Sequence, residues 1–283
     1  MKNKLNILLI TLTVFINSEL FTQVCAYPDV WNDAVSLLDK GDTNSALLEI
    51  ERYRFLNLDN SSCRFLYNLG EFYKLKGDWK EALSWYKEAE KKCSDPVLYS
   101  NARYNILYMY TLLKDHYFAG KYMDDILTDS VMIDSLIVNC KIIFLFSLLE
   151  QYRWDEALSL SKDIFPDSSE YCDSLFVSNT QFILKSEFKA FNLSYLPGAG
   201  QIYSGHFQEG MKSLFLQSVF ITGGIFAFNE GLYFISVGLC GSGFLRLYFG
   251  GQAYALKMVR FENEKKQNQA YINIKKGLFK LLK

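Results

Sequence analysis

The hydrophobic pattern divides the chain into a repeating amino-terminal part and a continuously apolar part nearer the carboxyl terminus. In the first part, a Gly-Asp or similar turn is followed four or five residues later by an alanine, and the signal recurs at Ala46, Ala82, Ala119 and Ala157. The intervals of 36, 37 and 38 residues are typical of a helical hairpin repeated along a chain. The pattern therefore predicts about four antiparallel helix pairs stacked in sequence.

The second helix pair carries the clearest version of this pattern. Its small, aromatic and turn positions are Leu66, Leu69, Gly70, Tyr73, Gly77-Asp78-Trp79, Ala82, Tyr86 and Ala89. This set resembles the tetratricopeptide repeat, and weaker versions contain Trp31, Leu107 and Leu145. The resemblance implies an all-α solenoid over residues 27–192, with Gly70 and Ala82 small where helices meet and Tyr73 and Tyr86 between neighbouring hairpins. A last helix over residues 170–192 would cap the stack.

The resemblance also implies a binding surface. In similar proteins the first helix of each hairpin lines a concave groove that holds an extended peptide or a partner helix. The polar and aromatic candidates on those helices are Tyr67, Asn68, Asn101, Arg103, Tyr104, Asn105 and Tyr108. The alternative is that the tyrosines are packing residues and the asparagines are merely solvated, which for any single residue is the commoner case.

Two apolar segments, Gly210–Phe228 and Leu232–Phe249, are joined by the turn Asn229-Glu230-Gly231. Each is close to the roughly 20 residues that a membrane-spanning helix needs. Lys212 and Arg246 lie at the ends away from the turn, where long side chains can reach lipid headgroups. We expect a two-helix transmembrane hairpin packed through small residues, namely Ser218, Thr222, Gly223, Ser236, Cys240 and Gly243. The alternative is a buried helical hairpin of a soluble domain.

A glycine-rich motif precedes the hairpin, and its main residues are Pro197, Gly198, Gly200, Gln201, Tyr203 and Gly205. It is similar to the Pro-Gly-x-Gly-Gln-x-Tyr-x-Gly signature of small bacterial membrane domains, common in the Bacteroidota, and that resemblance implies no activity. We interpret it as a structural entry into the membrane. The alternative is that Gln201 and Tyr203 bind a lipid headgroup or a partner helix. A dinucleotide-binding loop is excluded because the third glycine is missing and no strand precedes the motif.

The amino terminus has the pattern of an export signal. Lys2 and Lys4 precede an apolar run, Leu5–Ile16, and Val24-Cys25-Ala26 fits a signal-peptidase site. This predicts a cleaved signal peptide over residues 1–26, with an uncleaved anchor as the alternative.

Export makes the cysteine spacing informative, because disulfides persist in oxidising compartments. Cys63 and Cys93 lie 30 residues apart and Cys140 and Cys172 lie 32 apart, with each pair expected at one end of a helical hairpin. The hypothesis is two disulfides, and the alternative is four buried thiols.

Charge separates the body of the chain from its end. Residues 27–184 contain 25 acidic and 16 basic side chains, whereas residues 252–283 contain eight basic and two acidic ones. The acidic body argues against nucleic acid as a ligand. The basic end suits lipid headgroups, and residues 270–283 place Tyr271, Ile274, Leu278 and Leu281 on one face of an amphipathic helix expected to lie on anionic lipid.

No catalytic, metal or cofactor site is expected. His116 and His206 are the only histidines, and the sequence places no serine, cysteine or carboxylate beside either for nucleophilic catalysis. No cysteine pair has metal-ligand spacing.

These patterns predict a signal peptide, a repeat domain (27–192), a membrane module (193–251) and a basic tail (252–283). The expected function is a bacterial inner-membrane scaffold or adaptor that presents its repeats to periplasmic and envelope proteins, without a small-molecule substrate. The alternative is a membrane component, such as a small channel, transporter subunit or lipid-handling protein, which the repeats recruit. Export of the repeats followed by two membrane crossings places the basic tail in the periplasm, whereas basic segments beside membrane helices prefer the cytoplasm. A partial insertion around Leu193–Phe207 would reconcile them.

Overall fold

A computed structural model describes residues 28–56 and 62–282, and every regular element in those residues is a helix. The expectation of an all-α chain is therefore confirmed for the described residues, while the expected signal peptide lies outside them. The chain forms two compact units, one up to Ser147 and one from Leu148 onward. The boundary expected near residue 192 falls within the second unit.

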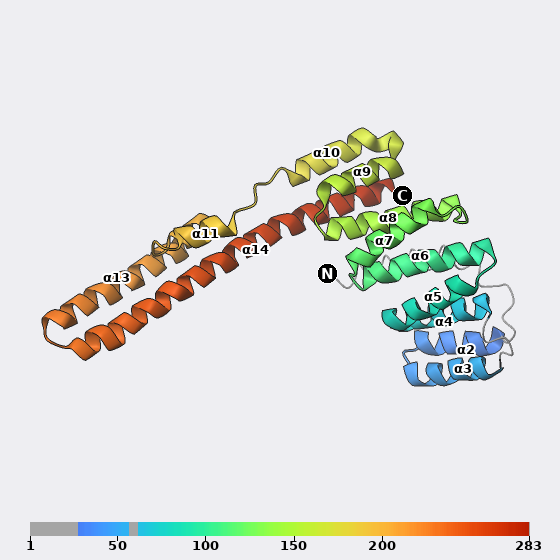
Figure 1. The fold of residues 1–283 in the computed structure, drawn as a ribbon, viewed down its shortest axis with the longest axis horizontal. Coiled ribbons are helices and arrows are strands. Elements are labelled where there is room, and N and C mark those ends of the chain that lie inside the picture. Colours follow the sequence, from blue (N-terminus) through green and yellow to red (C-terminus); the bar gives the residue numbers. More distant parts are fainter. Residues whose placement is uncertain (1–27, 57–61, 283) are drawn as a thin grey trace. The chain divides into compact units, whose positions relative to one another are not determined.

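The first unit consists of helix pairs joined in chain order (Figure 1). Its helices are α2 (Pro28–Asp39), α3 (Thr43–Leu56), α4 (Cys63–Lys76), α5 (Trp79–Lys92), α6 (Pro96–Leu112), α7 (His116–Thr128) and α8 (Asp134–Glu150), the last of which ends in the second unit. Helix α2 packs on α3, α4 on α5 and α6 on α7, while α5 also packs on α6. The alanines that mark the pattern, Ala46, Ala82 and Ala119, are fully buried.

One turn geometry recurs at the turns that the sequence pattern marks, and it is also found at Gly205 and Gly231. The backbone is left-handed at Gly41, Gly77, Lys114 and Tyr152, with φ of 81°, 85°, 58° and 60°. After each, the next amide donates to the carbonyl five residues back: Asp42 to Leu37, Asp78 to Tyr73, Asp115 to Tyr110 and Arg153 to Leu148, at 2.9 to 3.1 Å. This closes the first helix of each pair with the bond typical of a helix carboxyl terminus, so the sequence repeat is also a repeat of backbone structure.

The close approach of α4 and α5 is set by Gly70. A Cβ atom there would lie 2.6 Å from the ring of Tyr86, which is fully buried. Tyr73 stacks on Trp85, also of α5, at 6.4 Å between ring centroids. Both rings, which were expected between neighbouring hairpins, thus also pack inside their own helix pair.

The cysteines follow only part of the expected arrangement. Cys63 at the start of α4 is bonded to Cys93 at the end of α5, with their Cα atoms 4.9 Å apart. Cys140 and Cys172 are free and fully buried, so the second expected disulfide is absent. Each thiol sits in the core of a different unit as a small apolar group, and burial raises the pKa of Cys140 to about 12.

The second unit contains short helices and one long hairpin (Figure 1). Its elements are α9 (Trp154–Ile164), the 3₁₀ turn η2 (Pro166–Ser168), α10 (Ser169–Thr180), α11 (Glu187–Leu193), α12 (Ala199–Ser204), α13 (Phe207–Asn229), the π-helical η3 (Phe234–Gly241) and α14 (Ser242–Leu281). The capping helix expected over residues 170–192 is interrupted. Residues 181–186 are not helical because they bond to other elements. For example, the Lys185 amide donates to Asn263 Oδ1 at 2.9 Å, and Asn263 Nδ2 donates to the Lys185 carbonyl oxygen at 2.8 Å.

The hairpin is formed by α13 on one side and by η3 and α14 on the other. Two segments, Phe207–Asn229 and Phe234–Leu281, are long and apolar enough to cross a membrane. Their reversal is at Gly231, where φ is 75°. The turn expected at residues 229–231 is thus found at that position.

The amphipathic end of the chain is not a separate helix. It is the last part of α14, and its apolar residues Ile274 and Leu278 are fully buried. A Cβ atom at Gly277 would lie 2.5 Å from Leu175 of α10, and the Asn273 amide donates to Asn179 Oδ1 at 2.8 Å. The expectation of a tail resting on lipid is therefore wrong, because α10 covers its apolar face.

We predict that Gly70→Ala destabilises the first unit by about 1–3 kcal/mol, because the added methyl group overlaps the Tyr86 ring. The measurement is the urea midpoint of the helical circular dichroism signal. The matched control is Gly120→Ala in α7, where the new Cβ would be 3.9 Å from Phe144, and stability there should be equal or slightly higher. Equal midpoints for Gly70→Ala and the parent would contradict the packing described here.

Candidate functional site

The seven residues expected to line a binding groove lie on α4 and α6 and are all buried. They are Tyr67, Asn68, Asn101, Arg103, Tyr104, Asn105 and Tyr108. The expectation that they are exposed is wrong. The alternative was correct for the tyrosines, which pack, but not for the asparagines, which are enclosed rather than solvated.

Asn105 belongs to a buried hydrogen-bond network. Its amide group donates to Tyr67 OH at 3.0 Å and to Glu71 Oε1 at 3.1 Å. The same carboxylate accepts from Tyr86 OH and from Lys74 Nζ, both at 2.7 Å. These side chains come from α4, α5 and α6, so the network ties three consecutive helices together.

Burial and a nearby carboxylate act on the two tyrosines of the network. Burial raises the pKa of Tyr67 and of Tyr86 well above the usual value, and the Glu71 carboxylate raises both further. Both phenols therefore stay protonated around neutral pH. Glu71 is the centre of this network and was missed by the sequence reasoning, because no pattern distinguishes its position from a solvated one.

Arg103 has a comparable role further along the stack. Its guanidinium forms an ion pair with Asp129 and another with Glu90 at 3.3 Å. It also lies over the Tyr122 ring, 5.1 Å from the centroid. The residue expected to meet a partner is thus used to join α6 to α5 and to the end of α7.

The glycine-rich motif forms the connection between α11 and α13, which we call the elbow (residues 194–206). At Gly198, where φ is 80°, a Cβ atom would lie 2.2 Å from the carbonyl oxygen of Gly210. At Gly200 it would lie 1.8 Å from Ser194 Oγ, and at Gly205 the backbone is again left-handed, with φ of 97°. Pro197 immediately precedes the first of these glycines. The glycines therefore let the elbow approach the end of α11 and the start of α13 closely, without side chains between these three segments.

The polar residues of the motif are directed inward. Gln201 is 2% exposed and donates from Nε2 to the carbonyl oxygen of Gly251 at 3.0 Å, while Tyr203 OH accepts from the Ser186 amide at 3.1 Å. Gln217 of α13 is also 2% exposed and donates to Ser213 Oγ at 3.0 Å. Because Gln201 is enclosed, it is not placed to meet a lipid headgroup, and the geometry fits the structural interpretation of the motif.

Two acceptor atoms in this cluster have no partner. Neither Gln201 Oε1 nor Gln217 Oε1 accepts a hydrogen bond from the described part of the chain, and both are buried. Leaving a buried acceptor unpaired costs about 1–3 kcal/mol. The cluster around Gly251 is therefore a polar spot inside an otherwise apolar hairpin.

Both histidines have a serine neighbour, contrary to expectation. His116 Nδ1 lies 2.9 Å from Ser147 Oγ, and His206 Nδ1 lies 3.2 Å from Ser204 Oγ, with Glu262 3.9 Å from His206 Nε2. Ser204 is fully buried and donates its proton to the carbonyl oxygen of Gln201 at 2.6 Å, so that proton is engaged by the backbone. Residues 28–56 and 62–282 contain no group of three potential metal ligands.

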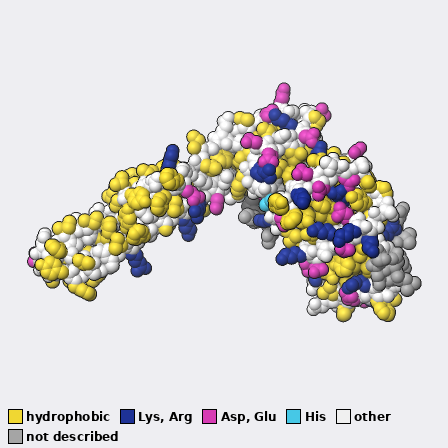
Figure 2. Space-filling model, viewed as in Figure 1, with side chains coloured by type: hydrophobic (Ala, Val, Ile, Leu, Met, Phe, Trp, Pro, Cys, Tyr) yellow, Lys and Arg dark blue, Asp and Glu magenta, His cyan; other side chains and the backbone are white. Residues whose placement is uncertain are grey.

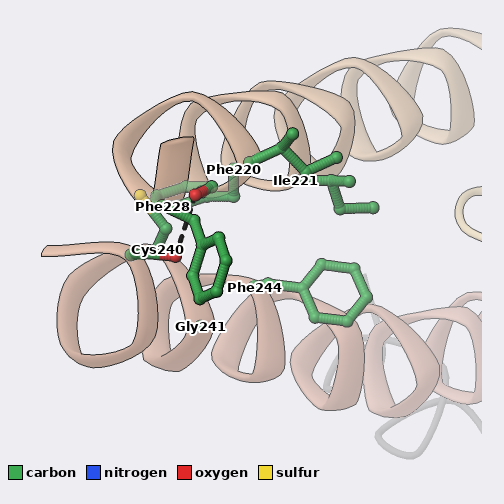
Figure 3. A pocket seen from close by; sticks show the side chains of 9 residues that line it. Phe220, Ile221, Phe228, Cys240, Gly241 and Phe244 are labelled. Carbon is green, nitrogen blue, oxygen red and sulfur yellow. Dashed lines mark hydrogen bonds between the residues drawn. The ribbon is translucent and has the colours of Figure 1, made fainter. Parts of the chain in front are cut away.

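A small apolar cavity of about 340 Å³ lies between α13 and η3 near the turn (Figure 3). Phe220, Phe228, Cys240 and Phe244 contribute to its wall, and the Ser236 hydroxyl next to them donates to the carbonyl oxygen of Gly224 at 2.8 Å. It holds no charged group.

The residues that let the two hairpin helices approach differ in part from those expected. A Cβ atom at Gly224 would lie 3.3 Å from Cys240 Cβ, and one at Gly243 would lie 2.4 Å from the Phe220 ring. Ser218 and Thr222 instead donate to carbonyl groups of their own helix and are exposed. A serine or threonine hydroxyl group on a helix can hydrogen-bond to a carbonyl group of its own helix. The sequence does not show whether the hydroxyl group does so or faces the neighbouring helix.

No protein-family model and no curated protein matches this chain.

We predict that Gly200→Ala loosens the elbow, since the methyl group would overlap Ser194 Oγ and approach the Ala190 carbonyl oxygen at 2.9 Å. Limited proteolysis should then cleave residues 181–186 faster, because Ser186 is held to the elbow through Tyr203. Gly250→Ala in α14 is the matched control, as a Cβ atom there has no neighbour within 4 Å, and its cleavage rate should equal that of the parent. Identical rates for both variants would show that the elbow is not closely packed.

Proposed function

We propose that the protein is a membrane-anchored scaffold whose tetratricopeptide-like repeats hold partner proteins on the periplasmic side of a bacterial inner membrane. The observation that carries the proposal is an apolar hairpin, left exposed by the other described elements, in the same chain as helix pairs that repeat along the sequence with one turn geometry. The hairpin supplies the anchor and the repeated helix pairs supply the binding part.

The anchor is supported by apolar side chains that no other element of the described residues covers. On the face shown in Figure 2, hydrophobic side chains spread along the hairpin of α13 and α14, while charged side chains concentrate elsewhere. Phe215 is 67% exposed on α13 and Phe234 is 84% exposed on η3. Large contiguous apolar surfaces are rare in proteins that stay in water, and a hydrocarbon environment would remove this one from water.

Packing within the second unit supports a topology. Helix α10 packs against the last part of α14, beyond the hairpin, through Leu175, Gly277, Asn179 and Asn273. The two ends of a membrane-spanning hairpin lie on the same side of the bilayer. Helix α10 and the end of the chain are therefore both on that side. This supports the periplasmic assignment of the basic tail, where the charge pattern alone favours the cytoplasm.

The compartment is supported by the cysteine pair. Bonded Cys63 and Cys93 suit an oxidising environment such as the periplasm. Such a bond would stabilise the first unit by about 3–4 kcal/mol for a loop of this length.

The binding part is supported by apolar side chains on the second helices of the repeats. Leu48 and Phe55 of α3 and Tyr117 and Phe118 of α7 are exposed, whereas the first-helix residues are engaged in the interior. Aromatic side chains are frequent anchors of protein interfaces. We therefore place partner contacts on the second helices rather than on the seven first-helix residues.

The competing function, a membrane component recruited by the repeats, rests on the unpaired Gln201 Oε1 and Gln217 Oε1 in the hairpin. Buried polar groups at membrane depth often mark functional positions. The scaffold is favoured because the cavity of about 340 Å³ in the hairpin is lined by apolar side chains and one serine and offers no polar path.

We predict that a protease site inserted between Glu230 and Gly231 is cut only from the cytoplasmic face, whereas one at Pro166–Ser168 is cut only from the periplasmic face. A Cβ atom at Gly231 would have no neighbour within 4 Å, so the turn has space for the insertion. The measurement is cleavage of the full chain in spheroplasts and in inverted membrane vesicles. Cleavage of both sites from one face would rule out a spanning hairpin, and free thiols at Cys63 and Cys93 in intact cells would rule out export.

We predict that a photoactivatable cross-linker at Phe55 or Tyr117 captures the same protein in intact cells, because both side chains face outward. The matched control is a cross-linker at Lys80, an exposed polar position on α5, which should capture it less efficiently. The measurement is the shift in mass of the full chain on a denaturing gel. Equal capture at all three positions would argue against a specific apolar surface on the second helices.

A further inference from the structure

We propose that α11 and the start of the elbow form an interfacial element that inserts into the edge of the bilayer, with phospholipid at the boundary between headgroups and acyl chains as its partner. The proposal rests on the anchoring function of the hairpin. It adds a third contact with the membrane that does not cross it.

The position of α11 along α14 is fixed by bonds at both ends. Arg260 of α14 donates from Nε and an Nη atom to Glu187, the first residue of α11, at 2.9 and 2.8 Å. Tyr248 OH of α14 donates to the carbonyl oxygen of Tyr195 at 3.4 Å. The segment 187–195 therefore lies beside residues 248–260 of α14 and runs antiparallel to them.

The rise per residue of α14 gives the depth of these contacts relative to the hydrocarbon layer of a bilayer. With the turn at Gly231 on one surface, a hydrocarbon layer of about 30 Å takes up about 20 residues and ends near Gly251. Tyr248 then lies about 4 Å inside that boundary and Arg260 about 13 Å outside it. Residues 187–195 therefore pass from beyond the headgroups to the edge of the acyl chains.

The side chains of this segment divide into two faces. Ala190 and Ser194, four residues apart, are buried against the rest of the unit. Phe188, Phe191 and Tyr195 follow the other face at helical spacing, and Phe188 is 73% exposed. This segment therefore has an apolar face that the other described residues leave exposed, and the face runs inward from the headgroup level to the edge of the acyl chains at Tyr195.

The apolar face is continuous with the surface of the anchor. Leu196 follows Tyr195 and is 67% exposed, and Phe207 at the start of α13 is also exposed. Aromatic side chains are enriched at the level of lipid headgroups, where the hairpin begins. One apolar surface thus extends from the hairpin onto α11.

Charge favours lipid over a protein partner or a second copy of the chain. Lys189 on α11 and Lys257 on α14 are exposed, and no carboxylate in residues 28–56 and 62–282 lies within ion-pair distance of either. Both lysines lie at or outside the edge of the hydrocarbon layer near Gly251. Basic side chains at that level attract anionic phosphate groups.

Broken helices at the edge of a membrane require that their backbone groups be satisfied. Ser194 Oγ donates to the Ala190 carbonyl oxygen at 2.7 Å, and Tyr248 OH donates to the carbonyl oxygen of Tyr195. The carbonyl groups of Ala190 and Tyr195 are therefore satisfied at this depth.

The test uses the full chain reconstituted in phosphatidylcholine and phosphatidylglycerol vesicles that contain brominated lipids, which quench tryptophan. Native tryptophans lie outside residues 187–283, so Tyr195→Trp and Leu196→Trp add a local signal over the parent. We expect a larger loss of that signal when bromine is near the headgroup end of the acyl chain than when it is near the methyl end. Val219→Trp in the middle of α13 should show the reverse order, and Phe55→Trp on α3 should show no loss.

The outcomes separate the two proposals. If Val219→Trp is quenched and both Tyr195→Trp and Leu196→Trp are not, α11 is covered by protein and this inference is overturned while the anchor stands. If Val219→Trp is also unquenched, the anchor itself is wrong. Circular dichroism equal to that of the parent ensures that each comparison reports position and not unfolding.

Discussion

Gly198 and Gly210 approach so closely that a side chain fits at neither position, and this contact fixes where the chain turns from the elbow into α13. The start of α13 then determines which of its residues face α14, so that Gly224 meets Cys240 and Phe220 meets Gly243. The same elbow places Gln201 against the backbone of α14 at Gly251. The hairpin, the elbow and α11 are therefore parts of one packing arrangement, and the proposed depth of each in a bilayer follows from the others.

Much of the fold could be predicted from the sequence because the repeat has a physical cause. Ala46, Ala82, Ala119 and Ala157 recur since two helices cross closely behind each turn, and all four are fully buried. The two long apolar segments could also be located, since length and apolarity are read directly from the chain. At Lys114 and Tyr152 the left-handed turn persists without glycine, which shows that the hairpin context outweighs the local preference there.

The candidate site could not be predicted as well, for two reasons. A polar side chain such as Asn105 has the same spacing whether it faces a groove or a buried carboxylate, and only the neighbouring helix carrying Tyr86 decides between them. The end of the chain presents an equal ambiguity, because the apolar face of Ile274 and Leu278 would suit lipid and protein alike. Periodicity identifies which residues share a face, but it does not identify what covers that face.

The uninterrupted helix from Phe234 to Leu281 has a mechanical consequence. At about 1.5 Å per residue this rod is about 70 Å long, with one end in the hairpin and the other clamped to α10. A helix of that length acts as a lever, so a change in the tilt of the hairpin displaces α10 by an amount that grows with distance from the pivot. In the proposed membrane anchor, variations in bilayer thickness or tension would thereby be transmitted to α10 as movement.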